Sequence, residues 1–377
     1  MSKLVVLIGA GFSAAAGLPL ARDINARFSR CQQKMLLQMS SSEWFWKDGK
    51  DETFINNGQL YSDTMYYSYV LDEIIILYIE DNGSFNDYEH FFEYLNVHCD
   101  DKAWIEKTHT SAKRKFLDDH PFLKTDEAKD FLFFLERPPS SSKLVGIINF
   151  LISDLLSVRI SPDIFDSYYV FFIKYLEKFD EISIFTLNHD LLLEKLLKFY
   201  DIKYSRGFSS NNSSIQYEGN ALPVFNDDFA NSKVKVFKLH GSLDYFRFSH
   251  YDNSSYTGQY NYFITSGYRE KHYASRINLE TGQLIQDFND DIIPKFITGK
   301  NKPAIIQNDI MFSALYRHFE NEVSSTDNLF ISGYSFSDDH INAVISKYSF
   351  QNIINNNRSK NYPFSGNVTN IKSLIEL

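Results

Sequence analysis

The sequence predicts an α/β fold, with a Rossmann-like, mostly parallel sheet that is interrupted by a large inserted helical module. Short β-branched apolar runs recur along the chain, and each ends at a glycine or a polar turn before a helical pattern begins. Strands that alternate with helices form parallel sheets. Residues 31–180 carry apolar residues at three- and four-residue intervals instead, which indicates a module of helices.

The chain opens with a predicted strand, a glycine turn and a helix. The run from Lys3 to Ile8, KLVVLI, shows no alternation and therefore suits a strand that is buried on both faces. From Ser13 the sequence is rich in alanine, and apolar residues continue at helical spacing through Leu20, Ile24 and Phe28. Gly17 and Pro19 are expected to bend the chain where a plain helix would continue.

The inserted module shows helical periodicity in several segments. These are Tyr67 to Ile79, Phe91 to Val97, Phe131 to Leu135 and Leu144 to Leu156. The acidic segment from Asn86 to His90 precedes the second of them. It could line the mouth of an active site, but the start of a helix with a buried aromatic face explains it better.

The second half of the chain returns to alternating strands and helices. Strands are expected over Glu181 to Phe185, Val234 to Leu239 and Asn328 to Ser332, and helices over Leu191 to Phe199 and Met311 to Val323. Residues 1–30 and 181–350 should therefore form the core. Within it, 209–220 is expected to be a loop and 245–290 an irregular insertion with short strands, while the Asn-rich residues 351–377 are expected to be peripheral.

The composition indicates a globular protein whose partners are small molecules or proteins. A hydrophobic content of 44%, with 16% aromatic residues, can fill a substantial core. The net charge of −10, without a long Lys/Arg run, argues against direct nucleic-acid binding and against coating an anionic membrane. No signal peptide opens the chain and no apolar run approaches the ~20 residues that span a bilayer, so we expect a cytoplasmic protein without a membrane partner.

The cysteines and acidic clusters predict no metal site. Cys31 and Cys99 are the only two cysteines and are far apart, so neither a disulfide framework nor a cysteine-based zinc ribbon is expected. Asp338, Asp339 and His340 resemble a metal cluster, but adjacent side chains do not easily share one ion. A helix cap is the favoured interpretation of these three residues.

The first candidate site is the glycine-rich turn Gly9-Ala10-Gly11-Phe12-Ser13-Ala14, which fits the dinucleotide fingerprint with alanine at the third small position. Glycine permits the tight turn, and the missing side chains let backbone N–H groups approach a pyrophosphate. A strand-to-helix turn without a ligand would give the same pattern. No strand ending in Asp or Glu follows about 20 residues later, where a dehydrogenase carries its ribose-binding acid.

Four short motifs each follow a predicted strand, which places them at the carboxyl edge of the sheet, where ligands of α/β proteins bind. They are Gly9-Ala10-Gly11-Phe12-Ser13 with Gly17-Leu18-Pro19, Thr186-Leu187-Asn188-His189-Asp190, Leu239-His240-Gly241-Ser242, and Gly333-Tyr334-Ser335-Phe336-Ser337-Asp338. In this order they resemble the motifs of the Sir2 family, and the last has the form seen in bacterial Sir2-like proteins. The resemblance covers about half of the chain and leaves 31–180 and 245–290 unexplained.

The resemblance implies that NAD⁺ is bound as a substrate. The glycine loop would hold the phosphates and the nicotinamide ribose, and the loop at Gly333 would hold the adenosine side. Asn188 would position a water or a ribose hydroxyl, and His240 would act as the general base. Other readings remain: Asn188 and Asp190 could cap the following helix, His189 is better explained as a turn residue, and His240 could be a core histidine.

The missing zinc module bears on the activity. Protein deacylases of the Sir2 family generally carry a four-cysteine zinc module, so without one the resemblance implies hydrolysis of NAD⁺ to nicotinamide and ADP-ribose, with a cyclised product as a variant. Zinc-free bacterial relatives deplete NAD⁺ in anti-phage abortive infection. We therefore expect a homo-oligomer or a trigger partner, such as an ATPase, a helicase or another defence protein. A deacylase or ADP-ribosyltransferase and a non-catalytic sensor of NAD⁺ or ADP-ribose are the alternatives.

Overall fold

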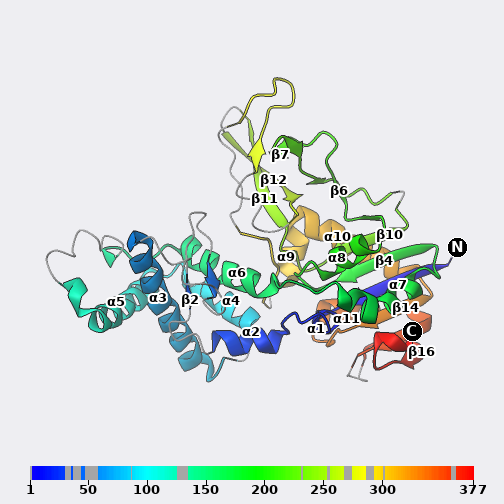
Figure 1. The fold of residues 1–377 in the computed structure, drawn as a ribbon, viewed down its shortest axis with the longest axis horizontal. Helices are drawn as coiled ribbons and strands as arrows, with labels where there is room; N and C mark the ends of the chain where they lie inside the picture. Colours follow the sequence, from blue (N-terminus) through cyan, green and yellow to red (C-terminus); the bar gives the residue numbers. More distant parts are fainter. Residues whose placement is uncertain are drawn as a thin grey trace. The chain divides into compact units, whose positions relative to one another are not determined.

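The computed structural model describes residues 2–29, 35–36, 44–46, 58–85, 87–124, 135–230, 232–252, 255–266, 274–285, 293–299, 302–357 and 362–377. The chain forms two compact units, which we call the sheet unit and the helical unit (Figure 1). The sheet unit comprises Met1–Leu20, Val158–Ile297 and Asn301–Leu377, and the helical unit comprises Ala21–Ser157 and Thr298–Lys300.

A seven-stranded sheet forms the centre of the sheet unit. Its order is β16-β15-β14-β1-β4-β10-β5, and every neighbouring pair is parallel. The strands are β1 (Lys3–Ile8), β4 (Glu181–Thr186), β5 (Tyr204–Ser205), β10 (Val234–Lys238), β14 (Asn328–Ser332), β15 (Ser349–Asn356) and β16 (Ser365–Asn370). The α/β prediction and the strands expected near Lys3, Glu181, Val234 and Asn328 are thus confirmed.

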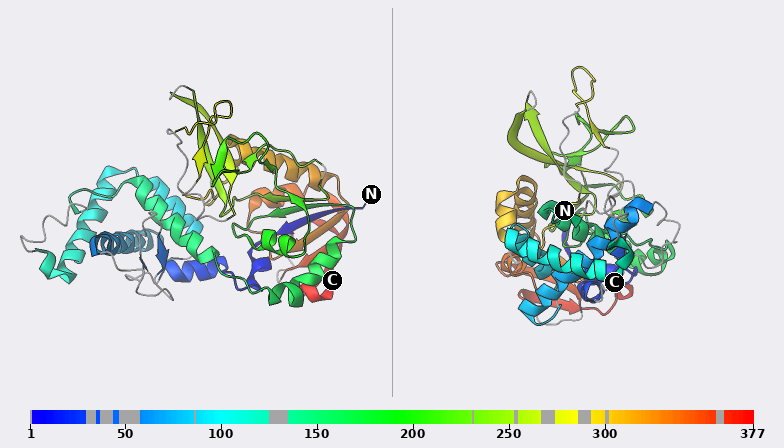
Figure 2. Two further views of the ribbon diagram at one scale, coloured as in Figure 1. Left: turned by 45° about the horizontal axis from the view of Figure 1, so that its top comes forward. Right: turned by 90° about the vertical axis from the view of Figure 1, so that its left-hand side faces the viewer.

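Helices cover both faces of this sheet, as the two views of Figure 2 show. Val5 and Leu7 of β1 lie in one core cluster, and Leu4 and Val6 lie in the other, because successive side chains of a strand point to opposite faces. The first face packs on α9 (Lys302–Asn308), α10 (Ile310–Ser324) and α11 (Asp339–Ile345), and the second on η5 (Phe165–Tyr169), α7 (Val170–Leu176) and α8 (Leu192–Phe199). Burial on both faces explains the unbroken apolar runs of the strands.

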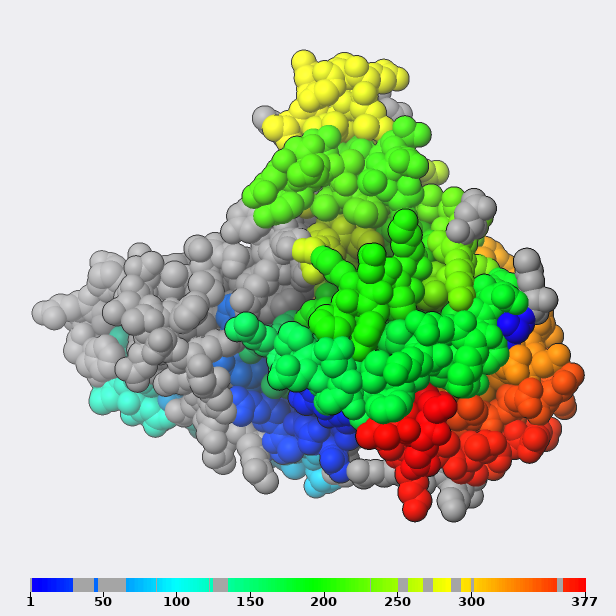
Figure 3. Space-filling model, turned by 45° about the vertical axis from the view of Figure 1, so that its right-hand side comes forward, coloured from blue at the N-terminus to red at the C-terminus, as the bar shows by residue number. Residues whose placement is uncertain are grey.

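The C-terminal residues differ from the expected peripheral segment, because β15 and β16 belong to the sheet. Asparagine amides bridge these strands, with Asn355 Nδ2 donating to Asn370 Oδ1 at 2.8 Å and Asn356 Nδ2 to Ser332 Oγ at 3.0 Å. The final turn, η7 (Leu374–Glu376), buries Leu374 beside α7 and η5, and Figure 3 shows the red C-terminal residues against green ones. These strands are joined partly by hydrogen bonds between asparagine side chains, and a pattern of hydrophobic residues does not reveal such strands.

Two antiparallel sheets lie between β5 and α9 in the sequence. One has the order β11-β12-β9-β6 and the other β13-β7-β8. Their strands are β6 (Phe208–Ser209), β7 (Ile215–Tyr217), β8 (Asn220–Ala221), β9 (Val224–Phe225), β11 (Tyr245–Asp252), β12 (Ser255–Ile264) and β13 (Ser275–Arg276). The expected loop 209–220 therefore contains strands, and β11 and β12 are longer than the short strands expected. Tyr245, Tyr262 and Phe263 are fully buried, which accounts for part of the aromatic content.

The helical unit has an aromatic core. Its elements are α2 (Ala21–Phe28), β2 (Met35–Leu36), β3 (Phe45–Trp46), α3 (Gly58–Asn82), α4 (Tyr88–His98), α5 (Lys102–Asp119), η2 (Pro121–Lys124) and α6 (Ser141–Leu156). The ring of Phe28 lies 5.3 Å from that of Trp46 and 5.9 Å from those of Phe85 and Phe91, measured between centroids. None of the helices in the described part of the chain is both long and apolar enough to span a bilayer.

The unit boundaries differ from the expected residues 30 and 180. The helix α2 belongs to the helical unit because Phe28 packs in its aromatic core, whereas η5 and α7 belong to the sheet unit because Tyr169 and Phe172 pack on the sheet. The helix start expected near Asp87 is confirmed: its carboxylate caps α4 by accepting from Glu89 N and His90 N. Asn86 and most of the pattern from Phe131 to Leu135 lie outside the described residues.

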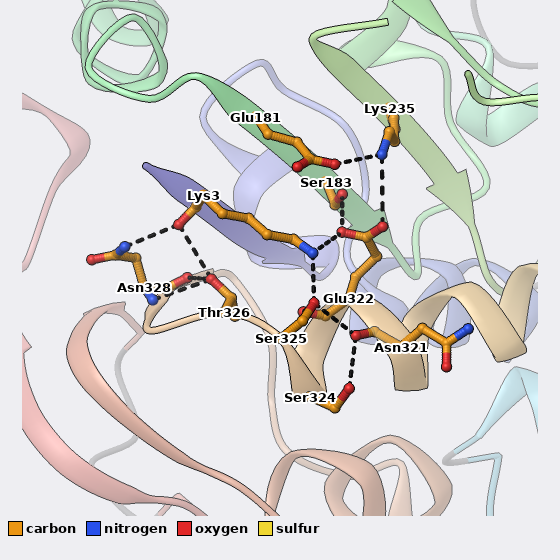
Figure 4. Close-up of polar contacts among 10 residues, drawn as sticks. All are labelled: Lys3, Glu181, Ser183, Lys235, Asn321, Glu322, Ser324, Ser325, Thr326 and Asn328. Atoms are coloured by element: carbon orange, nitrogen blue, oxygen red, sulfur yellow. Dashed lines mark hydrogen bonds and ion pairs between the residues drawn. The ribbon is translucent and has the colours of Figure 1, made fainter. Parts of the chain in front are cut away.

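A polar cluster lies at the amino ends of the strands (Figure 4). Glu322, near the end of α10, accepts from Ser183 Oγ at 2.8 Å and pairs with Lys3 at 2.7 Å. Lys235 lies 3.7 Å from the same carboxylate and pairs with Glu181 at 2.6 Å. Burial alone would raise the pKa of Glu322, but Lys3, Ser183 and Lys235 outweigh burial, so its pKa lies below the ordinary value.

We expect Glu322→Gln to lower the free energy of unfolding at pH 7 by about 1.5–3 kcal/mol, the usual contribution of hydrogen bonds to a charged group. Because the folded-state pKa is depressed, the stabilisation is present above the unfolded pKa of about 4.3 and is lost as pH falls through the folded value. Urea unfolding of both proteins between pH 3 and pH 7 measures this. Glu320→Gln is the control, since the exposed Glu320 pairs with Lys347, which is also exposed, at 3.5 Å. An equal loss at pH 3 and pH 7 would contradict the assignment.

Candidate functional site

Four segments meet at the carboxyl edge of the parallel sheet, and we call them together the four-loop site. They are residues 9–19 after β1, 187–191 after β4, 239–244 after β10 and 333–340 after β14. The chain first places β4, β5 and β10 on one side of β1, and then crosses the sheet to place β14, β15 and β16 on the other side. The order of the strands therefore switches between β1 and β14. Ligands of open α/β sheets bind at such a switch point.

The glycine-rich segment forms a shorter helix than expected. After Gly9, α1 spans only Ala10–Ala14, and Gly17 has a φ of 81°. Leu18 is buried and Pro19 half-buried, and the helix resumes as α2 at Ala21. The expected bend at Gly17 and Pro19 is confirmed. The side chain of Phe12 is anchored on Tyr169, whose hydroxyl donates to the carbonyl of Phe12 at 2.6 Å.

The glycines of this segment pack against the loop that follows β14. A Cβ on Gly9 would lie 2.6 Å from the carbonyl oxygen of Gly333, and one on Gly11 would lie 2.7 Å from its Cα. Gly11 N–H donates to Gly333 O at 2.9 Å, and Gly9 N–H donates to Ser332 O at 2.9 Å. These two N–H groups therefore fix the glycine segment against β14 and its loop. Ala10 and Gly11 are exposed beside them.

We expect Gly333→Ala to lose about 1–3 kcal/mol more stability than Gly219→Ala, which is the usual cost of overpacking. Both glycines have a positive φ, 68° and 78°, so both variants carry a similar backbone strain. A Cβ on Gly333 would overlap the backbone nitrogen of Phe12, whereas a Cβ on Gly219 would meet nothing within 4 Å. Urea unfolding of the two variants gives the difference. Equal losses would show that the two loops are not in contact in solution.

The turn after β4 is hydrogen-bonded to the glycine segment. Asn188 Nδ2 donates to Gly9 O at 3.1 Å and to Ser13 Oγ at 2.9 Å, and Ser13 Oγ donates to Asp190 Oδ2 at 2.9 Å. Among the described residues no group donates to Asn188 Oδ1. Asn188 N–H donates to Thr186 Oγ1 at 3.1 Å. The amide nitrogen of Asn188 thus joins the turn after β4 to the glycine segment.

The carboxylate of Asp190 caps α8, one of the roles that the sequence left open, and also binds the glycine segment. Its Oδ1 accepts from the N–H of Leu192 at the start of α8, at 2.9 Å, while Oδ2 holds Ser13. The ammonium group of Lys238 donates to the carbonyl oxygen of Asp190. Burial raises the pKa of Asp190, and nearby Lys238 opposes this effect without reversing it.

His189 is buried within the turn. Its ring stacks on Phe296 with centroids 4.5 Å apart, and its carbonyl accepts from Leu243 N–H at 2.9 Å. Burial first, and then Lys302 and Lys238, lower its pKa to about 3. These contacts are those of a neutral turn residue that joins the loops after β4 and β10.

The segment after β10 is fixed by a strap at residues 294–297. Gly241 has a φ of 91°, and a Cβ there would overlap the carbonyl oxygen of Lys295. Ser242 N–H donates to that same oxygen at 3.1 Å, and Ile297 N–H donates to His240 O at 2.8 Å. The backbone on both sides of the His240 side chain is therefore held in place.

The side chain of His240 faces the segment after β14. Its Nε2 lies 3.3 Å from Nε2 of His340 and 3.9 Å from Oδ1 of Asp338. Lys302 Nζ donates to the same Oδ1 at 2.9 Å. Burial first, and then Lys302 and His340, lower the pKa of His240 well below its ordinary value, so the imidazole is neutral at pH 7.

The segment after β14 begins at Gly333 and continues into α11. Tyr334 is buried, with its N–H donating to Asn357 Oδ1 at 2.8 Å, and Ser335 is exposed. Asp338 occupies the N-cap position of α11, but its side chain makes no capping bond and instead binds Lys302. The capping role expected for it is therefore wrong, because the buried ammonium group attracts the carboxylate more strongly.

The contacts of the four segments close into a ring. The glycine segment binds both Gly333 and Asn188, the turn with Asn188 binds the segment of His240 through Leu243, and His240 meets His340. Residues 182–364 are similar to the SIR2-like domain. This SIR2-like segment contains Asn188, His240 and Gly333 but begins after the glycine-rich turn.

No curated protein matches the chain. The chain aligns with a solved structure described as "Structural Basis for the Mechanism and Regulation of Sir2 Enzymes", with 12% identity and a TM-score of 0.31 over 95% of this chain and 83% of that chain.

A buried ionic network supports the His240 loop within the SIR2-like segment. Arg206 binds Asp244 through two hydrogen bonds of 2.6 and 2.9 Å, and Ser242 Oγ donates to Asp244 at 2.6 Å. Glu194 lies 3.6 Å from Arg206 and 3.4 Å from Lys238. Burial alone would raise the pKa of Asp244, but Arg206 outweighs it and the net shift is downward.

The sequence analysis missed this network and the neighbours of His240. Lys238 was a visible signal, because it is a charge inside an apolar strand, and Asp244 follows the His-Gly-Ser motif at a short distance. Nothing in the sequence pointed to Arg206 or Lys302. Asp338 and His340 were noticed, but their partner His240 lies 100 residues away along the chain.

Proposed function

We propose that this chain binds NAD⁺ at the four-loop site and cleaves its nicotinamide–ribose bond, with water as the acceptor. The observation that carries the proposal is the ring of contacts, because it gathers all four Sir2-like motifs at the switch point of a parallel sheet. In this proposal Ala10, Gly11, Gly17, Leu18, Pro19, Tyr334 and Ser335 line the nucleotide.

The chemistry places two demands on the site. Nicotinamide is a good leaving group, and the ribose carbon passes through an oxocarbenium-like state, so the site must orient the ribose and place a base beside a hydroxyl or a water. The oxygen of Asn188 supplies an acceptor that can orient a water or a ribose hydroxyl. The neutral imidazole of His240 supplies a lone pair that can take the proton.

Water is the proposed acceptor because the chain has only two cysteines, too few for the zinc module that generally accompanies deacylation in the Sir2 family. The products are then nicotinamide and ADP-ribose. We propose depletion of NAD⁺ in anti-phage abortive infection as the biological role. The helical unit would mediate self-assembly or bind a trigger partner, and a fully active monomer that no partner affects would overturn that last point.

The test is chromatographic detection of nicotinamide and ADP-ribose after the full chain is incubated with NAD⁺, alone and with an acetyl-lysine peptide. Equimolar release of the two products without the peptide supports hydrolysis. Release that requires the peptide and deacetylates it would establish a deacylase instead. Saturable binding of NAD⁺ without any release would establish a sensor and overturn the proposed reaction.

A further inference from the structure

We propose that His240, Asp338 and His340 form a binding site for a transition-metal dication of the zinc type. One ligand atom from each residue can be chosen so that all three lie within 4.8 Å of one another. The residues come from the two segments that follow β10 and β14. The ligand is a metal ion and not a nucleotide, although His240 is also the proposed general base of the four-loop site.

The spacing of the two imidazoles fits one shared ion. Zinc–nitrogen bonds of about 2.0–2.1 Å at tetrahedral angles place two ligand atoms about 3.3 Å apart. The Nε2 atoms of His240 and His340 lie 3.3 Å apart. Oδ1 of Asp338 lies 3.9 Å from Nε2 of His240, and the three ligand atoms lie within 4.8 Å of one another, so binding one ion requires the carboxylate to move closer to the two imidazoles.

The donor set selects the class of metal. Two imidazoles and one carboxylate suit zinc and its transition-metal neighbours, whereas magnesium and calcium prefer sites made of oxygen atoms. Three protein ligands leave a fourth position for water, which is the pattern of zinc sites that remain open to other molecules. The side chain of His240 is 4% exposed and that of Asp338 is 16% exposed, so the site is shielded but open to solvent on the Asp338 side.

The protein holds the three ligands through their backbone. Ile297 N–H donates to the carbonyl of His240 at 2.8 Å, and the hydroxyl of Tyr316 donates to the carbonyl of His340 at 2.5 Å. Asp338 and His340 are fixed relative to each other because Asp338 is the N-cap of α11 and His340 lies in its first turn. Because these contacts already hold the ligand residues in place, binding of an ion costs little conformational entropy.

Lys302 competes with the metal ion for the carboxylate of Asp338. Its ammonium group donates to Oδ1 of Asp338 at 2.9 Å and so occupies the carboxylate when no ion is present. A bound dication must share or displace this contact. Removing the ammonium group should therefore raise metal affinity, whereas a chance cluster of side chains would show no such gain.

The experiment titrates the chelator-treated full chain with cobalt(II), with visible absorption as the readout, and with zinc by calorimetry. We expect one ion per chain and the strong absorption of tetrahedral cobalt. His240→Gln, His340→Gln and Asp338→Asn should each weaken binding by more than about 100-fold, since loss of an outer-shell partner alone costs about 10–100-fold. Lys302→Met should tighten binding by at least about tenfold.

His318→Gln is the matched control, because His318 pairs with Asp227 at 2.8 Å in the same unit but belongs to no group of three possible ligands within the described part of the chain. It should bind cobalt as the unaltered chain does. Weak octahedral absorption, or equal affinity in all variants, would overturn the site. The readout uses no NAD⁺, so its failure and that of the proposed reaction are separate results. If that reaction holds, zinc should inhibit it by taking the lone pair of His240.

Discussion

Replacing His240 by glutamine is expected to slow the release of nicotinamide from NAD⁺ by about 10²–10⁴-fold, the usual contribution of a positioned acid or base. Glutamine keeps a polar side chain at this buried position but has no group that takes a proton at neutral pH. The loss should appear mainly in kcat, because the imidazole acts on the transition state and not on the binding of the nucleotide. Steady-state rates, with nicotinamide measured by chromatography, give the value.

The interpretation of this variant depends on two comparisons. His318→Gln should retain the full rate, since His318 lies on α10 and pairs with Asp227. Asn188→Ala should also lose nicotinamide release, because it removes both the acceptor oxygen and the bonds to Gly9 and Ser13. If His240→Gln keeps the full rate while Asn188→Ala loses it, the general base must be another group and the role given to His240 is wrong.

The second large effect concerns stability. Arg206→Met is expected to lower the free energy of unfolding by about 3–5 kcal/mol, because it leaves the carboxylate of Asp244 buried without its cationic partner. A loss of this size is a large fraction of the about 5–15 kcal/mol that holds a typical domain folded. Arg206→Lys should lose less, since a single ammonium group keeps the charge but not the paired hydrogen bonds. Urea unfolding at pH 7 measures both variants.

Arg317→Met provides the matched control for Arg206. Arg317 also binds an aspartate, Asp227, at 2.8 Å, but its side chain is 61% exposed, and we expect a loss below about 1 kcal/mol. The double variant Arg206→Met/Asp244→Leu should recover much of the stability, because well-packed apolar residues replace buried ion pairs at little cost. If Arg206→Met and Arg317→Met were equally harmful, burial of the Arg206–Asp244 pair would not be the source of its effect.

The sequence predicted those strands and helices whose residue pattern can be recognised within the segment itself. A strand such as β1 is buried on both faces, so its apolar run is visible without knowledge of its neighbours. By contrast, β15 contains polar asparagines whose partners lie on neighbouring strands. No local pattern reports such pairing, and the segment was therefore expected to be peripheral.

The same distinction applies to the four-loop site. The motifs around Asn188 and His240 were found because each stands directly after a strand. The close approach of Gly11 to Gly333, the pairing of His240 with His340 and the network around Arg206 all join distant parts of the chain. Their formation depends on the order of the strands in the sheet, which the periodicity of single segments does not encode.

The central position of β1 has a consequence for synthesis on the ribosome. The strand is translated long before one of its two neighbours, because the partner of Leu4 on that side is Asn328, more than 300 residues later in the chain. Until β14 has been translated, one edge of β1 has no partner and the glycine turn has no Gly333 to rest on. Nascent chains that have not yet reached β14 would therefore lack part of the four-loop site, because the loop at Gly333 follows that strand.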